Sequence, residues 1–214
     1  MRYAALNPIA DGVQLAVMED NILLFTSFAP MRSREASALP GFVEKELAGH
    51  SLSISDISFW STGAGPGGFT ALRMTAALIA AWAFEHENIK FRCVPGAIAL
   101  AGSLPGREGE MLDCLFDGRN NEILLYGLIF RNGRWESRNE NAILNENAFR
   151  SCYTPDRRYI VNAAELDAVR KITGTVALET REPDCSELIK TQAFEYDNDP
   201  DKLVYIREAV ELRP

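Results

Sequence analysis

The residues best suited to chemistry lie in one short stretch, GAGPGGFTALR at positions 63–73. Gly63, Gly65 and Gly68 have the G-x-G-x-x-G spacing of dinucleotide-binding loops, where glycines let backbone N–H groups approach a pyrophosphate. Such a loop belongs to the first strand–helix unit, with an acid closing the next strand, whereas here three strand-like segments precede it and the next strand ends without an acid. The Walker pattern nearly fits too, but Phe69 stands where its lysine is required. Both common nucleotide motifs are therefore disfavoured.

The same stretch also suits a tight turn between a strand and a helix. Glycines permit positive φ, Pro66 stiffens the chain, and Thr70 is expected to cap the helix by accepting a backbone N–H. Amides at the helix start would still suit an anion. Arg73 opposes the helix dipole, which predicts a specific partner for its side chain: a carboxylate, a loop carbonyl or an anion. The candidate loop residues are Gly63, Gly65, Pro66, Gly67, Gly68, Phe69, Thr70 and Arg73.

Composition limits the function classes. The chain has 214 residues and a net charge of −8, so it is a poor solo binder of nucleic acid, whose affinity comes mainly from neutralising phosphates. Its two histidines lack a second ligand at metal spacing, and its four cysteines form no C-x-x-C pair, which predicts no metal site and buried free thiols in a reducing cytoplasm. The N-terminus has no signal-peptide pattern, and no apolar run is long enough for a membrane helix.

Hydrophobic patterning predicts a β-β-β-α-β-α block followed by a sparser block that also opens with strands. The linker candidate is 105–109, which divides the chain into an N-terminal lobe, 1–106, with 202–214 packing back on it, and a smaller C-terminal lobe, 107–201. The expected strands are 3–6, 13–18, 22–28, 57–61, 90–94, 111–116, 123–130, 134–137 and 159–162, and the expected helices are 32–48 (kinked or starting late at Pro40-Gly41), 70–87, 97–104 and 163–172.

One predicted helix is apolar nearly all round. Residues 74–84 read MTAALIAAWAF, in which Thr75 is the one polar residue. A surface helix normally has a polar face, so this helix is either buried on both sides or presents one side to a partner. The pattern leaves both interpretations open.

These features together resemble the TsaB family, also called YeaZ, of the glycoprotease-like superfamily. The main likeness is STGAGPGGFTALRMTAALIAAWAF at 61–84, which is similar to a family signature of the form GPGSFTGLRIG followed by an alanine-rich helix. VQLAVMEDNILLFTSF at 13–28 resembles the family's opening hairpin, FDGRNNEI at 116–123 its IDARRGEVY turn, and LVYIR at 203–207 its closing segment. The likeness covers most of 1–130 in order, whereas 135–200 match poorly.

The resemblance implies an α/β, actin-like ATPase fold with two lobes, each built on a ribonuclease-H-like mixed sheet flanked by helices. It also implies a non-catalytic cytoplasmic subunit in the synthesis of threonylcarbamoyladenosine in tRNA. Such a subunit binds a TsaD-like catalytic paralogue, which a TsaE-like ATPase joins, and it meets tRNA only indirectly. Carried over to this sequence, the partner-interface residues are Leu39, Phe42, Val43, Leu72, Ala76, Ile79 and Ala80.

The residues also agree with a subunit that needs no cofactor. Asn7 stands where actin-like kinases usually have an aspartate, and residues 32–47 lack the histidine pair of the catalytic relative. Ala71 and Thr75 replace glycines of the family motif, which marks a divergent member. Two alternatives stay open: a small actin-like kinase or ATPase, and a homodimer that buries helix 70–84. Weak binding of ATP or ADP between the lobes would involve Gly65–Gly68 with Asp117 and Arg119.

Overall fold

The first lobe is built on a five-stranded sheet in the order β3-β2-β1-β4-β5. The computed structural model describes residues 1–31 and 37–203. The strands are β1 (Arg2–Ile9), β2 (Gly12–Glu19), β3 (Ile22–Pro30), β4 (Phe59–Gly63) and β5 (Lys90–Val94). Successive hairpins make β1, β2 and β3 antiparallel, and the second turn uses Asp20 and Asn21 at positive φ. β4 and β5 then pair in parallel, because helical crossovers connect them.

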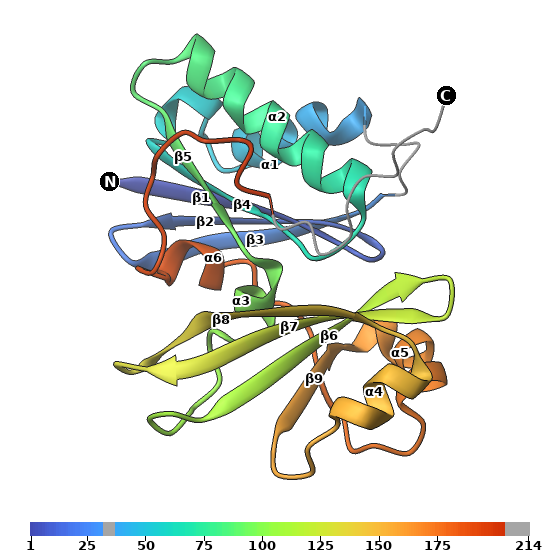
Figure 1. Cartoon of the computed structure of the whole chain (residues 1–214). Helices are drawn as coiled ribbons and strands as arrows, with labels where there is room; N and C mark the ends of the chain where they lie inside the picture. The colour runs from blue at the N-terminus through green and yellow to red at the C-terminus, as the bar shows by residue number, and fades with distance from the viewer. Residues whose placement is uncertain (32–36, 204–214) are drawn as a thin grey trace.

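Two helices cover one face of this sheet (Figure 1). They are α1 (Leu39–Gly49) and α2 (Phe69–Glu85), and a short 3₁₀ turn, η2 (Ile54–Asp56), precedes β4. Leu39, Val43 and Leu47 of α1 recur at helical spacing and are buried against the sheet with Trp60 and Ile79. Their burial fixes the face that α1 and α2 turn inward.

The second lobe repeats the plan of the first. Its sheet has the order β10-β9-β6-β7-β8, in which β6, β7 and β8 are antiparallel and β9 and β10 follow in parallel. Both sheets therefore share one strand order and one set of directions. The strands are β6 (Met111–Arg119), β7 (Glu122–Arg131), β8 (Arg134–Leu144), β9 (Arg158–Asn162) and β10 (Glu179–Arg181). On the outer side lie α4 (Glu146–Cys152) and α5 (Leu166–Thr173) (Figure 1), and a short 3₁₀ turn, η3 (Ala163–Glu165), connects β9 to α5.

The lobes meet through α3 (Gly96–Ala101) and α6 (Glu187–Lys190), which lie between the two sheets (Figure 1). All residues of α3 from Ala97 to Ala101 are buried, in a core cluster that draws on both lobes. Residues 183–199, which the sequence division places in the second lobe, run back against the first. Gln14 donates to the carbonyl of Pro183 (2.8 Å), and the backbone N–H of Asn198 donates to the carbonyl of Phe91 (3.0 Å).

The predicted fold class and most predicted strands are confirmed. Helix 32–48 begins late, at Leu39, and 32–36 lie outside the described residues, as does most of the closing segment 203–207. The predicted strand 57–61 lies at 59–63, and β6 and β7 extend into 117–122, the interval between the predicted strands 111–116 and 123–130. The predictions missed α4, β10 and α6. No helix among the described residues is long and apolar enough to cross a membrane.

Candidate functional site

The glycine loop connects β4 to α2 and is tied to the neighbouring strand–helix junction. Ala64 donates its backbone N–H to the carbonyl of Val94 (2.7 Å), and the carbonyl of Gly65 accepts from the N–H of Gly96 (2.7 Å). Gly65 has a φ of 101°, a conformation that favours glycine, and the Gly65–Pro66 peptide bond is cis. The first half of the loop is therefore fixed by the protein itself.

The glycines of the loop have different roles. A Cβ at Gly63 would overlap Oδ1 of Asn7 and lie 3.1 Å from Cδ of Pro8, so β4 needs a glycine where it passes β1. A Cβ at Gly67 or Gly68 would meet nothing within 4 Å, and both residues are exposed. Packing explains Gly63, whereas Gly67 and Gly68 leave open space above the loop.

The predicted cap at Thr70 is wrong. α2 begins at Phe69, its N-cap residue is Gly68, and no side chain makes a capping hydrogen bond. The helix starts one residue before Thr70, so that hydroxyl lies inside the first turn and cannot occupy the capping position. Arg73 is exposed on the outward side of α2. Its role stays a prediction.

The predicted interface residues lie mainly inside the chain. Leu39, Val43, Leu72, Ala76 and Ile79 are buried with at most 3% of their surface exposed, and Phe42 and Ala80 are partly buried against the same core. The outward side of α2 is formed by other residues. These are Thr70, Arg73, Ala77, Ala81 and Phe84, and Phe84 is 93% exposed.

A cleft of about 320 Å³ lies between the lobes, and it brings the predicted loop and the predicted inter-lobe residues together. Asp117 and Arg119 come from the end of β6, opposite the loop from the first lobe. The lining also includes Asn7, Pro8, Gly65–Gly68, Met74, Thr75, Gly96, Asn162 and Glu165. The glycine loop, the end of β1 and Asp117 of the second lobe thus line the same cavity.

Glu165 is a cleft residue that sequence reasoning missed. Its Oε1 accepts the backbone N–H of Asp117 (3.1 Å), and Oδ1 of Asp117 accepts the backbone N–H of Arg119 (2.8 Å). Burial raises the pKa of Glu165 to about 7; the negative charges of Asp117 and Asp11 contribute to this rise, and the hydrogen bond from the Asp117 N–H opposes it. The one available signal was position, because Glu165 follows the carboxyl end of a predicted strand.

The first-lobe wall of the cleft offers mostly neutral groups. Asn7 donates to Oε1 of Gln14 (3.3 Å), and Pro8 has no backbone N–H. Thr75, which replaces a motif glycine, is fully buried and is bonded to Thr62 (3.1 Å) and to the carbonyl of Leu72 (3.0 Å). The substitution is therefore used in packing and does not line the cleft with a free hydroxyl.

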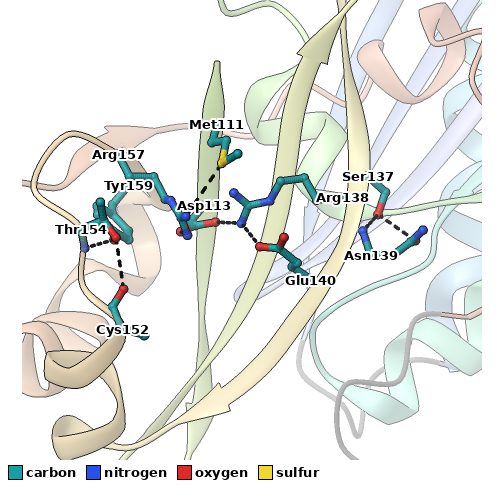
Figure 2. A network of polar contacts seen from close by, with 10 residues as sticks. All are labelled: Met111, Asp113, Ser137, Arg138, Asn139, Glu140, Cys152, Thr154, Arg157 and Tyr159. Carbon is teal, nitrogen blue, oxygen red and sulfur yellow. Dashed lines mark hydrogen bonds and ion pairs between the residues drawn. The ribbon is translucent and has the colours of Figure 1, made fainter. Parts of the chain in front are cut away.

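A second polar cluster lies on the outer face of the second sheet (Figure 2). Asp113 is fully buried between two arginines: Nη2 of Arg138 lies 2.6 Å from Oδ1, and Nη1 of Arg157 lies 3.0 Å from Oδ2. The strands slip in register between Tyr126 and Leu128, and a Cβ at Gly127 would lie 2.5 Å from Nη2 of Arg138. Gly127 therefore makes room for the Arg138 side chain. Arg157 is therefore held in an ion pair with Asp113.

Arg92 anchors the returning segment to the first lobe. It is 3% exposed, and it donates to Oγ of Ser61 (3.0 Å) and to the carbonyls of Phe194 (2.7 Å) and Leu188 (2.9 Å). Its guanidinium also lies 4.3 Å from the ring centre of Tyr196. Burial lowers the pKa of Arg92, and its described partners are neutral groups. This arrangement holds 188–196 in place.

Three of the four cysteines are buried. Cys93, Cys114 and Cys185 are free and buried, as expected, and burial raises the pKa of Cys93 to about 12, so it is a poor nucleophile; Cys152 is exposed. Among residues 1–31 and 37–203, no group of three histidine, cysteine or acidic side chains is arranged to hold a metal ion.

Comparison with solved structures identifies the fold. The chain is similar to an uncharacterized protein with similarity to peptidase YeaZ from Pseudomonas aeruginosa, with 16% identity, a TM-score of 0.74, and coverage of 96% of this chain and 99% of that one. It is also similar to YeaZ from Pseudomonas aeruginosa, with 17% identity, a TM-score of 0.68 and 88% of each chain covered. The ethanolamine utilization protein EutJ from Carboxydothermus hydrogenoformans is more distant, with 11% identity, a TM-score of 0.50, and 88% and 87% covered. No family model and no curated protein matches the sequence.

These likenesses show an actin-like fold of the YeaZ type along nearly the whole chain. The two sheets, β3-β2-β1-β4-β5 and β8-β7-β6-β9-β10, have the same strand order, as expected for two related lobes.

Proposed function

We propose that the chain is a divergent TsaB (YeaZ)-type protein, a non-catalytic cytoplasmic subunit in tRNA threonylcarbamoyladenosine synthesis that acts by binding a TsaD-like catalytic subunit. The observation that carries the proposal is the outward side of α2. Leu72, Ala76 and Ile79 bury one side of this helix in the core. Thr70 and Arg73 lie at the start of the outward side, and after them Ala77, Ala81 and Phe84 turn an apolar surface to solvent, where a surface helix normally has polar residues.

The chemistry of the chain supports a binding role. The first-strand turn supplies the Asn7 amide where a kinase of this fold supplies a carboxylate for magnesium. Each of the two histidines is the C-cap residue of a helix, His50 for α1 and His86 for α2. The His50 ring also stacks on Phe25. The acidic net charge of −8 suits a subunit that leaves tRNA, and the contact with a TsaE-like ATPase, to its partner.

Co-purification with the TsaD-like protein of the same organism tests this proposal. Wild type and an Ala163→Glu control, which places a charge at an exposed alanine of the second lobe, are expected to retain the partner. Ala81→Glu is expected to lose it, because a carboxylate would be buried without a counter-charge in the contact. Depletion of the chain should lower threonylcarbamoyladenosine in tRNA, measured by mass spectrometry. The proposal fails if the two proteins never associate and the nucleoside level stays unchanged.

A second candidate is a small actin-like kinase or ATPase. The inter-lobe cleft favours it, because that cleft joins Gly65–Gly68 to Asp117 and Arg119. Its charge opposes it, because Asp117 and Glu165 face the space that phosphates would occupy. Calorimetric titration with magnesium-ATP decides the matter: heat of binding with thermal stabilisation supports this candidate, and the absence of both excludes it.

A further inference from the structure

The first sheet has an edge strand, β3, that nothing in the described part of the chain covers. β2 is its one neighbour in the strand order. The opposite edge, β5, is covered, because Asn198 exchanges hydrogen bonds with Phe91: N–H to carbonyl at 3.0 Å, and Oδ1 to N–H at 2.7 Å. The backbone N–H and C=O groups along an uncovered edge can pair with an extended strand of another molecule.

β3 lacks the charged side chains that usually protect such an edge. The other uncovered edge among the described residues, β8, has them in Arg134, Glu136 and Glu140. None of the residues of β3 is charged, and four of its large apolar side chains are 41–68% exposed. These side chains are those of Ile22, Leu23, Leu24 and Phe28.

α1 runs alongside β3 and turns two polar side chains toward it. The His50 ring stacks on Phe25, with ring centres 3.8 Å apart, and Oγ of Ser27 donates to Oε2 of Glu46 (2.7 Å). Two residues of a strand advance about 6.6 Å and four residues of a helix about 6 Å, so the two contacts keep pace along antiparallel elements. A strand added to β3 would therefore lie beside this side of α1.

Glu46 gives this edge a sign of charge. In the described part of the chain, the group that its carboxylate contacts is the neutral hydroxyl of Ser27. A residue directly opposite Ser27 in an added strand would lie about 5 Å away on the same face of the sheet. A lysine or arginine there reaches the carboxylate, whereas an acidic residue is repelled. On the other face, an added strand would meet the exposed side chains of Thr26 and Phe28.

We propose that β3 binds an extended segment of a partner protein, which adds a strand to the first sheet and places a lysine or arginine between apolar residues. The backbone pairing supplies affinity, the basic residue opposite Ser27 pairs with Glu46, and the apolar residues cover Phe28. α2 packs over β1, β4 and β5, so this contact is separate from the one proposed for α2.

Fluorescence anisotropy with three labelled, end-blocked peptides tests the proposal. The probe TIVKVIT places lysine between apolar residues, TIVEVIT replaces the lysine by glutamate, and TIPKPIT removes two backbone donors. We expect the wild type to bind the lysine peptide about tenfold or more tightly than the glutamate peptide, and not to bind the proline peptide. The proposal is wrong if the lysine peptide shows no saturable binding, or if the proline peptide binds as well.

Charge variants of α1 show whether Glu46 makes the selection. Glu46→Lys should reverse the preference, and Glu46→Gln, which keeps an acceptor for the Ser27 hydroxyl, should abolish it. Glu44→Lys makes the same charge change at an exposed position about 200° around the helix, so it should keep the wild-type preference. Ala81→Glu, on the outward side of α2, should leave peptide binding unchanged. Equal effects of Glu46→Lys and Glu44→Lys would mean that the peptide senses only net charge, which overturns the proposal.

Site-directed labelling locates the bound peptide. In a Cys152→Ser background, the remaining cysteines are buried. A maleimide attached to one end of the lysine peptide should then label Thr26→Cys faster than Asn141→Cys, which lies at an exposed position of β8. An excess of unlabelled lysine peptide should remove this difference. Equal labelling rates at the two positions would contradict binding at β3.

Discussion

Replacing Glu165 by glutamine should stabilise the protein at neutral and alkaline pH. The carboxyl group lies in the inter-lobe cleft, where burial and the charges of Asp117 and Asp11 raise its pKa from 4.5 to about 7. One oxygen already accepts the backbone N–H of Asp117, a hydrogen bond that a glutamine oxygen can also accept. Glu165→Gln therefore keeps the contact and removes the charge.

The sign and size of this change in stability follow from proton linkage. Between pH 4.5 and about 7, the unfolded chain has lost the proton while the folded state still holds it, so stability falls as the pH rises and then stays level. The interval between 4.5 and about 7 corresponds to about 3 kcal/mol. Glutamine cannot ionise, so the variant should be about 3 kcal/mol more stable than the wild type above pH 7, and the difference should vanish near pH 4.5.

Urea unfolding at pH 5 and pH 8 measures both differences. Glu146→Gln is the matched control, because the Glu146 side chain is 50% exposed in a helical ion pair and should change stability by only a few tenths of a kcal/mol. A stabilisation of equal size at both pH values would refute the reasoning, since it would not come from ionisation. A destabilisation at pH 8 would refute it as well.

Three further substitutions, and Gly67→Ala as a neutral comparison, test the packing and the anchoring by Arg92. Gly63→Ala should destabilise by about 1–3 kcal/mol in urea, because its Cβ overlaps an amide oxygen of β1, whereas Gly67→Ala should be nearly neutral. Gly127→Ala should destabilise the protein about as much as Gly63→Ala, because its Cβ would displace the buried Arg138 guanidinium. Chemical denaturation should show that the loss of stability is confined to the second lobe. Arg92→Met should leave buried carbonyls without a donor and speed tryptic cleavage at Lys190, while an unchanged digestion rate would contradict the anchoring role.

The first-lobe sheet was predictable because local signals define it. The turn at Asp20-Asn21 separates two β-rich runs, and the apolar run after the glycine loop is long enough to specify a helix. The short elements were not predictable from periodicity, since α6 has four residues and β10 has three. For α4 a local signal existed in Asn145, whose side chain accepts the N–H of Ala148 (2.9 Å).

The candidate site was predictable only in part. The glycine loop, Asp117 and Arg119 were identified from motif and resemblance, and the structure places them in one cleft. Glu165 was not predicted, because its burial depends on the way the two lobes meet. Its hydrogen-bond partner, Asp117, is 48 residues away in the sequence. The inward and outward sides of α2 could not be distinguished from the sequence. A helix that is apolar nearly all round has no polar face to indicate which side is exposed.

The anchoring by Arg92 has a consequence for synthesis on the ribosome. Its carbonyl partners lie in 188–194, and the residue that covers the β5 edge is Asn198. The first lobe is thus translated long before the residues that complete it, and the whole second sheet emerges in between. Until then, water takes the place of these partners at the Arg92 guanidinium and the β5 edge, so we expect the first lobe to reach its full stability only after residues 188–198 have emerged.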